Sequence, residues 1–171
     1  MQLVVREESP ADVGHIHALN AAAFETDAEA RLVDALRTNG RLTLSLVGVE
    51  DAVVVGHIAF SPVTISQRDG TVVPGLGLAP MAVTPSRQRC GIGTLLATAG
   101  LDRLRAGGHR FCVVLGHPKF YQRFGFTRAS WFGIRWERKV PDELFFALEL
   151  TRGGLEDVSG VVRYSGEFAI V

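Results

Sequence analysis

Residues Val72 to Gly107 read VVPGLGLAPMAVTPSRQRCGIGTLLATAGLDRLRAG. The pattern predicts an extended segment that ends near Val83, a basic loop from Thr84 to Cys90, and a helix that begins at Gly91 or Gly93. Glycines let the backbone approach a ligand closely, and the first N–H groups of a helix have no partner inside the helix. Because these groups lie at the positive end of the helix dipole, the junction predicts a site for an anion such as a phosphate. A nucleotide-like ligand is therefore the first hypothesis.

The residues after the two glycines exclude one common phosphate loop and weaken the case for another. A Walker loop closes on Gly-Lys-Ser/Thr, but Gly93 is followed by Thr94 and Leu95, so no lysine is present to reach a terminal phosphate. A dinucleotide-binding loop has a third small residue where this chain has Leu96, and the next predicted strand ends at Gly116 without a clear acidic residue. Hydrolysis of ATP or GTP is not expected.

The hexapeptide QRCGIG, residues Gln88 to Gly93, lies between a predicted strand and a predicted helix. In this setting it resembles the Q/R-x-x-G-x-G/A pyrophosphate loop of the GNAT superfamily of N-acetyltransferases, which bind acetyl-CoA. The tripeptide Met81-Ala82-Val83 precedes it, and YQRFGF, residues Tyr121 to Phe126, is similar to the family's second acetyl-CoA motif. The resemblance implies an acetyl-CoA-dependent N-acetyltransferase.

The composition is that of one soluble globular domain. The chain has 171 residues, of which 47% are hydrophobic and 21% charged, so a disordered protein is not indicated. Eighteen basic and eighteen acidic side chains cancel, which leaves no overall field to attract nucleic acid or an anionic membrane. The two cysteines, Cys90 and Cys112, lack metal-ligand spacing, and we expect neither a disulfide nor a metal site.

No targeting or membrane segment is evident in the sequence. The N-terminus, MQLVVREE, carries charges where a signal peptide needs an apolar run, and no stretch approaches about 18 uninterrupted apolar residues. We therefore expect a cytoplasmic protein with no nucleic-acid or membrane partner.

Capping and turn signals divide the N-terminal half into elements. Ser9-Pro10-Ala11-Asp12 and Thr26-Asp27-Ala28-Glu29 each predict the start of a helix, and Asn39-Gly40 predicts the end of the second one. Turns are predicted at Glu50-Asp51 and at Arg68-Asp69-Gly70. The strands expected between these signals are Leu3 to Arg6, Leu42 to Val49, Val53 to Ile65 with breaks at Gly56 and Pro62, and Val72 to Val83 with a bulge or splayed end around Ala79 to Met81.

The C-terminal half has fewer signals of this kind. A helix from Gly93 is expected to reach Ala106 and to end at Gly107-Gly108, and a short helix from His117 to Phe124 is expected to stop at Gly125. The strands expected here are Arg110 to Leu115, parallel to its predecessor, then Trp131 to Trp136, Leu144 to Leu150 and, less distinctly, Val161 to Tyr164.

This order of elements matches the GNAT architecture over roughly residues 1–150. The resemblance implies an α/β fold with a mixed, mostly antiparallel central sheet, splayed strands and flanking helices. We expect residues 1–150 to form the acetyltransferase domain and residues 151–171 to be a C-terminal extension packed on it.

The resemblance also implies which residues hold acetyl-CoA. Backbone groups of Met81 and Val83 would hold the pantetheine arm and the thioester, and the amides of the loop would hold the pyrophosphate. An amine would then attack the thioester directly, without a covalent acetyl-enzyme and without a metal. The implied contacts are Met81, Ala82, Val83, Gln88, Arg89, Cys90, Gly91, Ile92, Gly93 and Thr94.

Two proton transfers accompany this reaction. The resemblance implies that Tyr121, four residues before Gly125, is the general acid for the leaving thiolate, while simple ring packing is the alternative. For the general base, Glu25 lies between the first two predicted helices, in a region that often borders the acceptor site in the family, and His117 lies at a strand end beside the proposed groove. Asp27 and Glu29, which are equally suited to helix capping, His57, which suits a structural role, and a water relay remain alternatives.

Several other side chains have two interpretations each. Arg87 and Arg89 either pair with CoA phosphates or are surface arginines, and Cys90 is interpreted as a small loop residue rather than a nucleophile. Lys119 and Arg123 either reach the adenosine end or form the wet face of a short helix. The aromatic residues Trp131, Phe132 and Trp136 either line an acceptor pocket or pack in the core.

The sequence leaves the acceptor open among a small amine, an amino acid, an antibiotic and a protein amine. A homodimer is compatible with the family resemblance. The alternative function is a non-catalytic acyl-CoA-binding or regulatory module with the same fold.

Overall fold

The computed structural model of the chain describes residues 2–171. Within this range the strands form one mixed sheet in the order β1-β2-β3-β4-β5-β8-β6, with β9 beside β3 and β7 beside β9. Only the β4–β5 and β7–β9 pairs are parallel among the pairings described here. The predicted fold class, a mostly antiparallel mixed sheet with helices, is confirmed.

Two compact units make up the chain. Unit 1 consists of the chain up to Ser61, Ala79–Asp102 and Gly166–Val171, and unit 2 consists of Pro62–Leu78 and Arg103–Ser165. The strands β3 (Val53–Ser66) and β4 (Val72–Val83) and the helix α3 (Ile92–Ala106) each contribute residues to both units.

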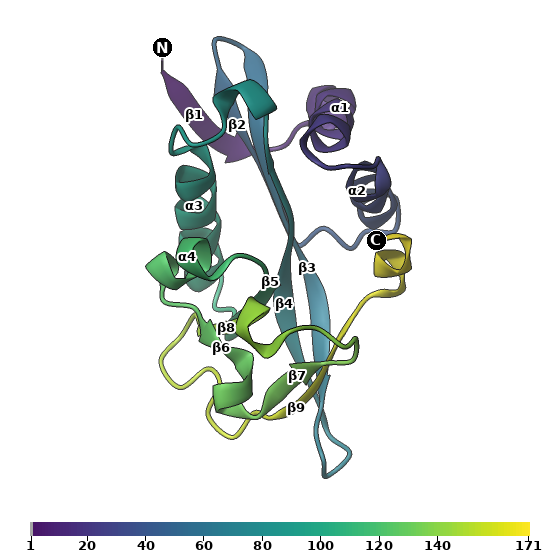
Figure 1. Ribbon diagram of the computed structural model, residues 1–171, viewed down its shortest axis with the longest axis vertical. Helices are drawn as coiled ribbons and strands as arrows, with labels where there is room; N and C mark the ends of the chain where they lie inside the picture. Colours follow the sequence, from purple (N-terminus) through teal and green to yellow (C-terminus); the bar gives the residue numbers. More distant parts are fainter. Residues whose placement is uncertain (1) are drawn as a thin grey trace. The chain divides into compact units, whose positions relative to one another are not determined.

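In unit 1, helices cover both faces of the β2–β3 hairpin (Figure 1). Val47 of β2 (Leu44–Glu50) packs with Ile16 of α1 (Val13–Ala23) and Val33 of α2 (Ala28–Thr38) in one buried cluster. Its neighbour Gly48 faces Ile92 and Leu96 of α3. Because successive strand residues point to opposite faces, α1 and α2 lie on one face of the hairpin and the start of α3 lies on the other.

The strand β3 is continuous through Gly56 and Pro62, so the predicted breaks there are wrong. Gly56 is paired with Gly48 of β2, and a Cβ atom at Gly56 would lie 2.8 Å from both Ile92 and Leu96. Gly56 therefore marks the close approach of α3 rather than the end of a strand. The turn between β2 and β3 falls at Asp51 and Ala52, with φ angles of 50° and 65°, one residue later than expected.

The predicted starts of both N-terminal helices are confirmed. The Asp12 carboxylate accepts hydrogen bonds from the Ser9 backbone N–H at 2.7 Å and from the Ser9 hydroxyl at 2.9 Å. Arg6 of β1 (Leu3–Glu7) donates to the same carboxylate at 2.7 Å and holds the pKa of Asp12 well below its usual range. The first turn, Pro10–Asp12, is a 3-10 turn that leads into α1.

In unit 2 the sheet is built around β5 and β8. Leu76 and Gly77 of β4 pair in parallel with β5 (Phe111–Leu115), which pairs antiparallel with β8 (Phe145–Glu149). The short strand β6 (Thr127–Arg128) also pairs with β8. The α4 region consists of the helix α4 (Pro118–Tyr121) and a 3-10 turn (Gln122–Phe124). It ends at Gly125, which has a φ angle of 94°, as predicted.

The end of the chain forms a further strand in unit 2. β9 (Gly160–Tyr164) pairs antiparallel with the end of β3 and parallel with β7 (Ile134–Trp136), which confirms the indistinct strand prediction at Val161 to Tyr164. The predicted strand from Trp131 is wrong in its first half, because Ala129–Phe132 is a 3-10 turn that ends at Gly133 with a φ angle of 71°. The bulge or splayed end expected near Pro80, which follows a cis peptide bond, stays a prediction.

Candidate active site

The loop between β4 and α3 has the geometry expected of an anion-binding turn. Two residues just before the helix, Arg89 and Gly91, have left-handed φ angles of 61° and 85°. The first backbone bond of the helix runs from the Leu95 N–H to the Gly91 carbonyl at 3.1 Å. The N–H groups before Leu95 therefore have no carbonyl partner inside the helix. Helix α3 begins at Ile92, between the two positions that the sequence offered.

Two polar contacts hold this loop in unit 1. The Gln88 side-chain amide donates to the carbonyl of Val83, the last residue of β4, at 3.1 Å. Arg87 donates through Nε and Nη2 to the two carboxylate oxygens of Glu50, at 2.9 and 2.7 Å. Arg87 thus has a structural partner at the end of β2. Contact of Arg87 with a CoA phosphate stays a prediction.

Other residues of the loop are open to solvent. The side chains of Arg89 and Cys90 are exposed, and Ala82 is buried between the half-buried residues Met81 and Val83. This alternation leaves one face of the end of β4 partly uncovered. Arg89 has no ion pair within residues 2–171, so it is the better placed of the two arginines for contact with a phosphate.

Tyr121 in unit 2 is a buried tyrosine held by aromatic contacts. Its ring meets Phe120 and Phe126 edge to face, with centroid separations of 4.9 and 5.7 Å. A Cβ atom at Gly116 would overlap this ring, so the glycine is needed for the tyrosine to pack there. Burial raises the pKa of Tyr121 to about 12, so its hydroxyl stays protonated at neutral pH and is able to donate a proton.

The two other catalytic candidates are exposed. His117, also in unit 2, is the N-cap of α4, and its carbonyl accepts from the Phe120 and Tyr121 N–H groups at 3.1 and 3.2 Å. Glu25 lies in unit 1 on the bend between α1 and α2. The structure thus places Glu25 in unit 1 with the loop between β4 and α3, residues 84–91, which we call the anion loop. It places His117 with Tyr121 in unit 2.

The alternatives near Glu25 differ in their partners. Asp27 forms an ion pair with Arg31 at 3.1 Å in the first turn of α2. Glu29, also in the first turn of α2, has a buried carboxylate oxygen, Oε2, with no hydrogen-bond partner among residues 2–171. A buried carboxylate oxygen without a partner is uncommon. Glu29 is therefore a stronger base candidate than its capping position suggested.

His57 lies in a buried polar network in unit 1. The Asn20 side-chain N–H donates to His57 Nδ1 at 3.2 Å and to the Ile16 carbonyl at 3.0 Å. Since an amide NH₂ only donates, Nδ1 must accept, and the ring proton lies on Nε2, 2.9 Å from the Ser45 hydroxyl. Ser45 donates in turn to Glu8, which is paired with Arg37 at 2.9 Å.

The burial of His57 argues against a direct catalytic role. Its side chain has no exposed surface, and burial lowers its pKa to about 4. A group without exposed surface does not meet an acceptor amine, so the interpretation of His57 as the general base is not supported. The structural alternative accounts for its contacts.

The aromatic residues after Phe126 have different surroundings. Trp131 is 72% exposed, whereas Phe132 packs against the buried cluster of unit 2. Trp136 stacks on Phe145 with a centroid separation of 5.9 Å and lines a cavity within unit 2. Its role toward an acceptor stays a prediction.

Residues 2–171 contain no group of three His, Cys, Asp or Glu side chains placed to hold a metal ion. In the same range, no helix has the length and apolar character needed to cross a bilayer.

Comparison with known proteins identifies the family. The family model described as "Acetyltransferase (GNAT) domain" matches residues 4–129, more than half of the chain. This protein belongs to the GNAT acetyltransferase family. The GNAT resemblance noted from the loop and the Tyr121 motif is therefore confirmed.

Relatives of this GNAT protein match along nearly its whole length. It is 38% identical to the uncharacterized N-acetyltransferase YhbS of Escherichia coli K12 over 167 residues, 97% of this chain and 98% of the relative. The crystal structure of E. coli YhbS in complex with CoA has a TM-score of 0.92, at 37% identity, and the match covers 99% of this chain and 93% of that one. A GNAT acetyltransferase of Brucella melitensis in complex with acetyl-CoA has a TM-score of 0.81, at 37% identity over 98% of both chains.

Two features near the candidate site, the contact of Glu50 with Arg87 and the burial of a Glu29 oxygen, were not predicted from the sequence. Glu50 was assigned to a turn, although it anchors Arg87 across 37 residues of chain. Glu29 was considered both as a general base and as a capping residue, and the burial of its carboxylate oxygen has no signature in the sequence. Acidic residues at strand ends and in first helical turns are the only signal that would have pointed to either.

Proposed function

We propose that this GNAT protein is an acetyl-CoA-dependent N-acetyltransferase in which a primary amine attacks the thioester directly within a ternary complex. The proposal is carried by the B. melitensis relative, which is 37% identical over 98% of both chains and was solved with acetyl-CoA. At this identity and coverage, the co-substrate of the relative is the first candidate for this chain.

The loop before α3 fits the diphosphate of such a co-substrate. Its left-handed residues, Arg89 and Gly91, turn the backbone just ahead of the free N–H groups of the helix. The exposed Arg89 guanidinium adds a cation that matches phosphate geometry. We assign the pyrophosphate contacts to Gln88 through Thr94, and the contacts to the pantetheine arm and thioester to the backbone of Met81 through Val83.

The reaction needs few protein groups. The amine nitrogen, once neutral, forms a bond to the thioester carbon, and the carbon–sulfur bond breaks. Backbone N–H groups stabilise the negative charge that develops on the carbonyl oxygen. The Tyr121 hydroxyl gives its proton to the leaving sulfur, and the attacking nitrogen loses its second proton as it becomes an amide, which reprotonates Tyr121 directly or through water. Glu25, His117 or Glu29 takes the ammonium proton, directly or through water.

The remaining expectations stay predictions. These are a small-molecule or protein amine as the acceptor, assembly into a homodimer, a cytoplasmic location, and a domain of residues 1–150 with an extension at 151–171.

Release of the CoA thiol in the presence of a panel of small amines, amino acids, aminoglycosides and peptides tests the proposal. With the best acceptor, double-reciprocal plots at several acetyl-CoA concentrations should intersect, as direct transfer requires. Parallel lines, or an acetylated protein detected by intact mass after incubation with acetyl-CoA alone, would refute the ternary complex. Tight binding of acetyl-CoA without thiol release from any acceptor would favour the non-catalytic module.

A further inference from the structure

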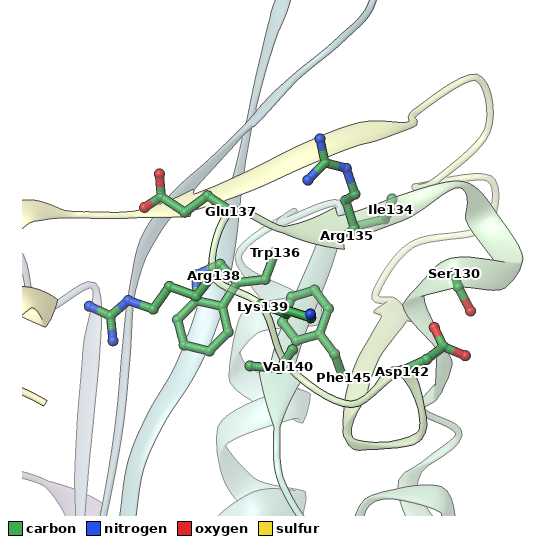
Figure 2. A pocket seen from close by; sticks show the side chains of 10 residues that line it. All are labelled: Ser130, Ile134, Arg135, Trp136, Glu137, Arg138, Lys139, Val140, Asp142 and Phe145. Atoms are coloured by element: carbon green, nitrogen blue, oxygen red, sulfur yellow. The ribbon is translucent and has the colours of Figure 1, made fainter.

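A cavity of about 280 Å³ lies entirely within unit 2, and the reaction proposed above assigns it no role. Its lining comes from the 3-10 turn before β7, from β7, from the segment that follows β7, and from the start of β8 (Figure 2). The lining residues are Ser130, Ile134, Arg135, Trp136, Glu137, Arg138, Lys139, Val140, Asp142 and Phe145.

One part of the lining is apolar and fixed. Trp136 and Phe145 lie side by side in the middle of the group (Figure 2), with their ring planes only 18° apart. Tyr164 packs on Trp136 at a centroid separation of 5.2 Å, and Arg138 lies 5.2 Å from the centre of the Trp136 ring. Because the indole is held on several sides, it forms a rigid apolar wall for a ligand.

The charged side chains of the lining leave an excess of positive charge at the cavity. Glu137 and Asp142 are each paired with an arginine from outside the cavity, Arg163 at 3.2 Å and Arg128 at 3.5 Å. The exposed cations Arg135 and Lys139, in contrast, have no carboxylate partner in the part of the chain that the structure describes. The charge left over at the cavity is therefore positive.

We propose that this cavity binds a small anionic ligand, with a carboxylate or phosphate group at Arg135 and Lys139 and an apolar body against Trp136 and Phe145. The volume is near the lower end of ligand pockets, which begin at roughly 300 Å³, so the ligand is about one ring in size. This inference goes beyond the proposed function, because it requires neither acetyl-CoA nor acetyl transfer.

The two tryptophans provide a local reporter of binding, since the chain has only Trp131 and Trp136. Their indole N–H signals in a ¹⁵N spectrum are assigned with the Trp131→Phe variant. Phenyl phosphate, phenylacetate, the uncharged phenylacetamide and the cationic phenethylamine are titrated into the full chain with excess CoA present, so that the loop before α3 does not compete for the anions. The two anions distinguish a phosphate ligand from a carboxylate ligand.

We expect at least one anion to shift the Trp136 signal saturably, with an affinity about tenfold or more above that of phenylacetamide or phenethylamine. Reversal of both cations in the Arg135→Glu/Lys139→Glu variant should weaken binding at least about fivefold, and added salt should weaken it in the wild type. The matched control, Arg68→Glu, reverses an exposed cation in the β3–β4 turn and should leave the affinity unchanged.

Three results would overturn the proposal: no saturable shift with either anion, equal affinity for phenylacetamide, or equal weakening in the Arg68→Glu control. If the double variant does not fold, as judged by its thermal melting, the comparison of the four probes on the wild type decides alone.

Discussion

The surroundings of Tyr121 keep its hydroxyl protonated, as the proposed role of proton donor requires. The residue is only 8% exposed, and burial raises the pKa of its hydroxyl to about 12. A hydroxyl with such a pKa does not ionise between pH 6 and pH 9, so it is fully available as an acid throughout that range. Its edge-to-face contacts with Phe120 and Phe126 depend on the ring and not on the hydroxyl.

The Tyr121→Phe variant should therefore fold normally and lose only the hydroxyl that is proposed to donate the proton. We expect kcat for thiol release to fall by about 10²-fold, with little change in the KM for acetyl-CoA. The control is Tyr164→Phe, which removes the hydroxyl of the only other tyrosine. An unchanged kcat in Tyr121→Phe, or an equal loss in both variants, would assign Tyr121 to packing.

Arg87 and Glu50 form the contact that fixes the anion loop to β2. The Glu50 carboxylate is nearly buried and accepts both guanidinium bonds. If Arg87 acts only through Glu50, then Arg87→Ala, Glu50→Gln and the double variant should all raise the KM for acetyl-CoA by a similar factor of about two- to tenfold, since each frees the loop.

Steady-state kinetics of the three variants test this coupling. A larger effect of Arg87→Ala than of Glu50→Gln would instead indicate that Arg87 contacts a phosphate. Arg31→Ala, which breaks an exposed ion pair in α2, serves as the control and should leave the KM unchanged.

At the level of elements, the paired glycines Gly48 and Gly56 position the first turn of α3. A Cβ atom at Gly56 would lie 2.8 Å from Ile92 and from Leu96, whereas one at Gly48 would have its nearest contact at 3.5 Å. The first distance is an overlap and the second is ordinary contact. The two positions face the same helix, so they form a matched pair for substitution.

Gly56→Ala should destabilise the protein by about 1–3 kcal/mol, because it overpacks the contact between β3 and α3. It should also raise the dissociation constant for CoA, because the anion loop is continuous with the displaced helix. Gly48→Ala should be nearly neutral in both respects. Urea unfolding and CoA titration of both variants provide the measurement, and equal effects at the two positions would contradict the packing argument.

The elements that the sequence predicted well are those with local causes. Ser9 with Asp12, and Gly125 at the end of the α4 region, act within a few residues, and both features are present as expected. The break expected at Gly56 was wrong because its cause, the approach of Ile92 and Leu96, lies far along the chain. The strand expected from Trp131 to Trp136 was wrong in its first half, because a 3-10 turn and Gly133 precede β7 there.

At the scale of the whole molecule, the candidate site also has one part that the sequence predicts from local signals and another part that depends on contacts between distant residues. The loop from Gln88 to Thr94 was predictable because its glycines and the following helix are adjacent in sequence. The bond between Asn20 and His57 joins residues 37 positions apart, and so does the bond between Arg87 and Glu50. Such pairings depend on strand register and helix packing, which a single sequence does not specify.

The buried network around His57 links the stability of the molecule to pH. Burial opposes ionisation of Glu8, but hydrogen bonds from Arg37 and Ser45 keep its pKa below the usual value. Burial lowers the pKa of His57 from 6.5 to about 4, although the nearby Glu8 charge acts in the opposite direction. His57 is therefore neutral in the folded protein near pH 5, whereas an unfolded histidine is mostly protonated there.

The unfolded state thus binds more protons than the folded state between pH 6.5 and about 4. Stability due to neutral His57 is complete above pH 6.5, declines as the pH falls through this window, and stops declining near pH 4, where the folded protein also takes up the proton. With 1.36 kcal/mol per pKa unit, the decline amounts to about 3 kcal/mol.

Urea unfolding from pH 7.5 to pH 4.5 should show this decline in the wild type. The His57→Gln variant keeps an amide that can bond to Ser45 or Asn20 but has no titrating group, so it should be less stable than the wild type at pH 7.5 and approach it as the pH falls. His15→Gln, at an exposed position of α1, should parallel the wild type. A constant difference between wild type and His57→Gln across the window would show that His57 stabilises the fold by packing alone and that its protonation is not linked to unfolding.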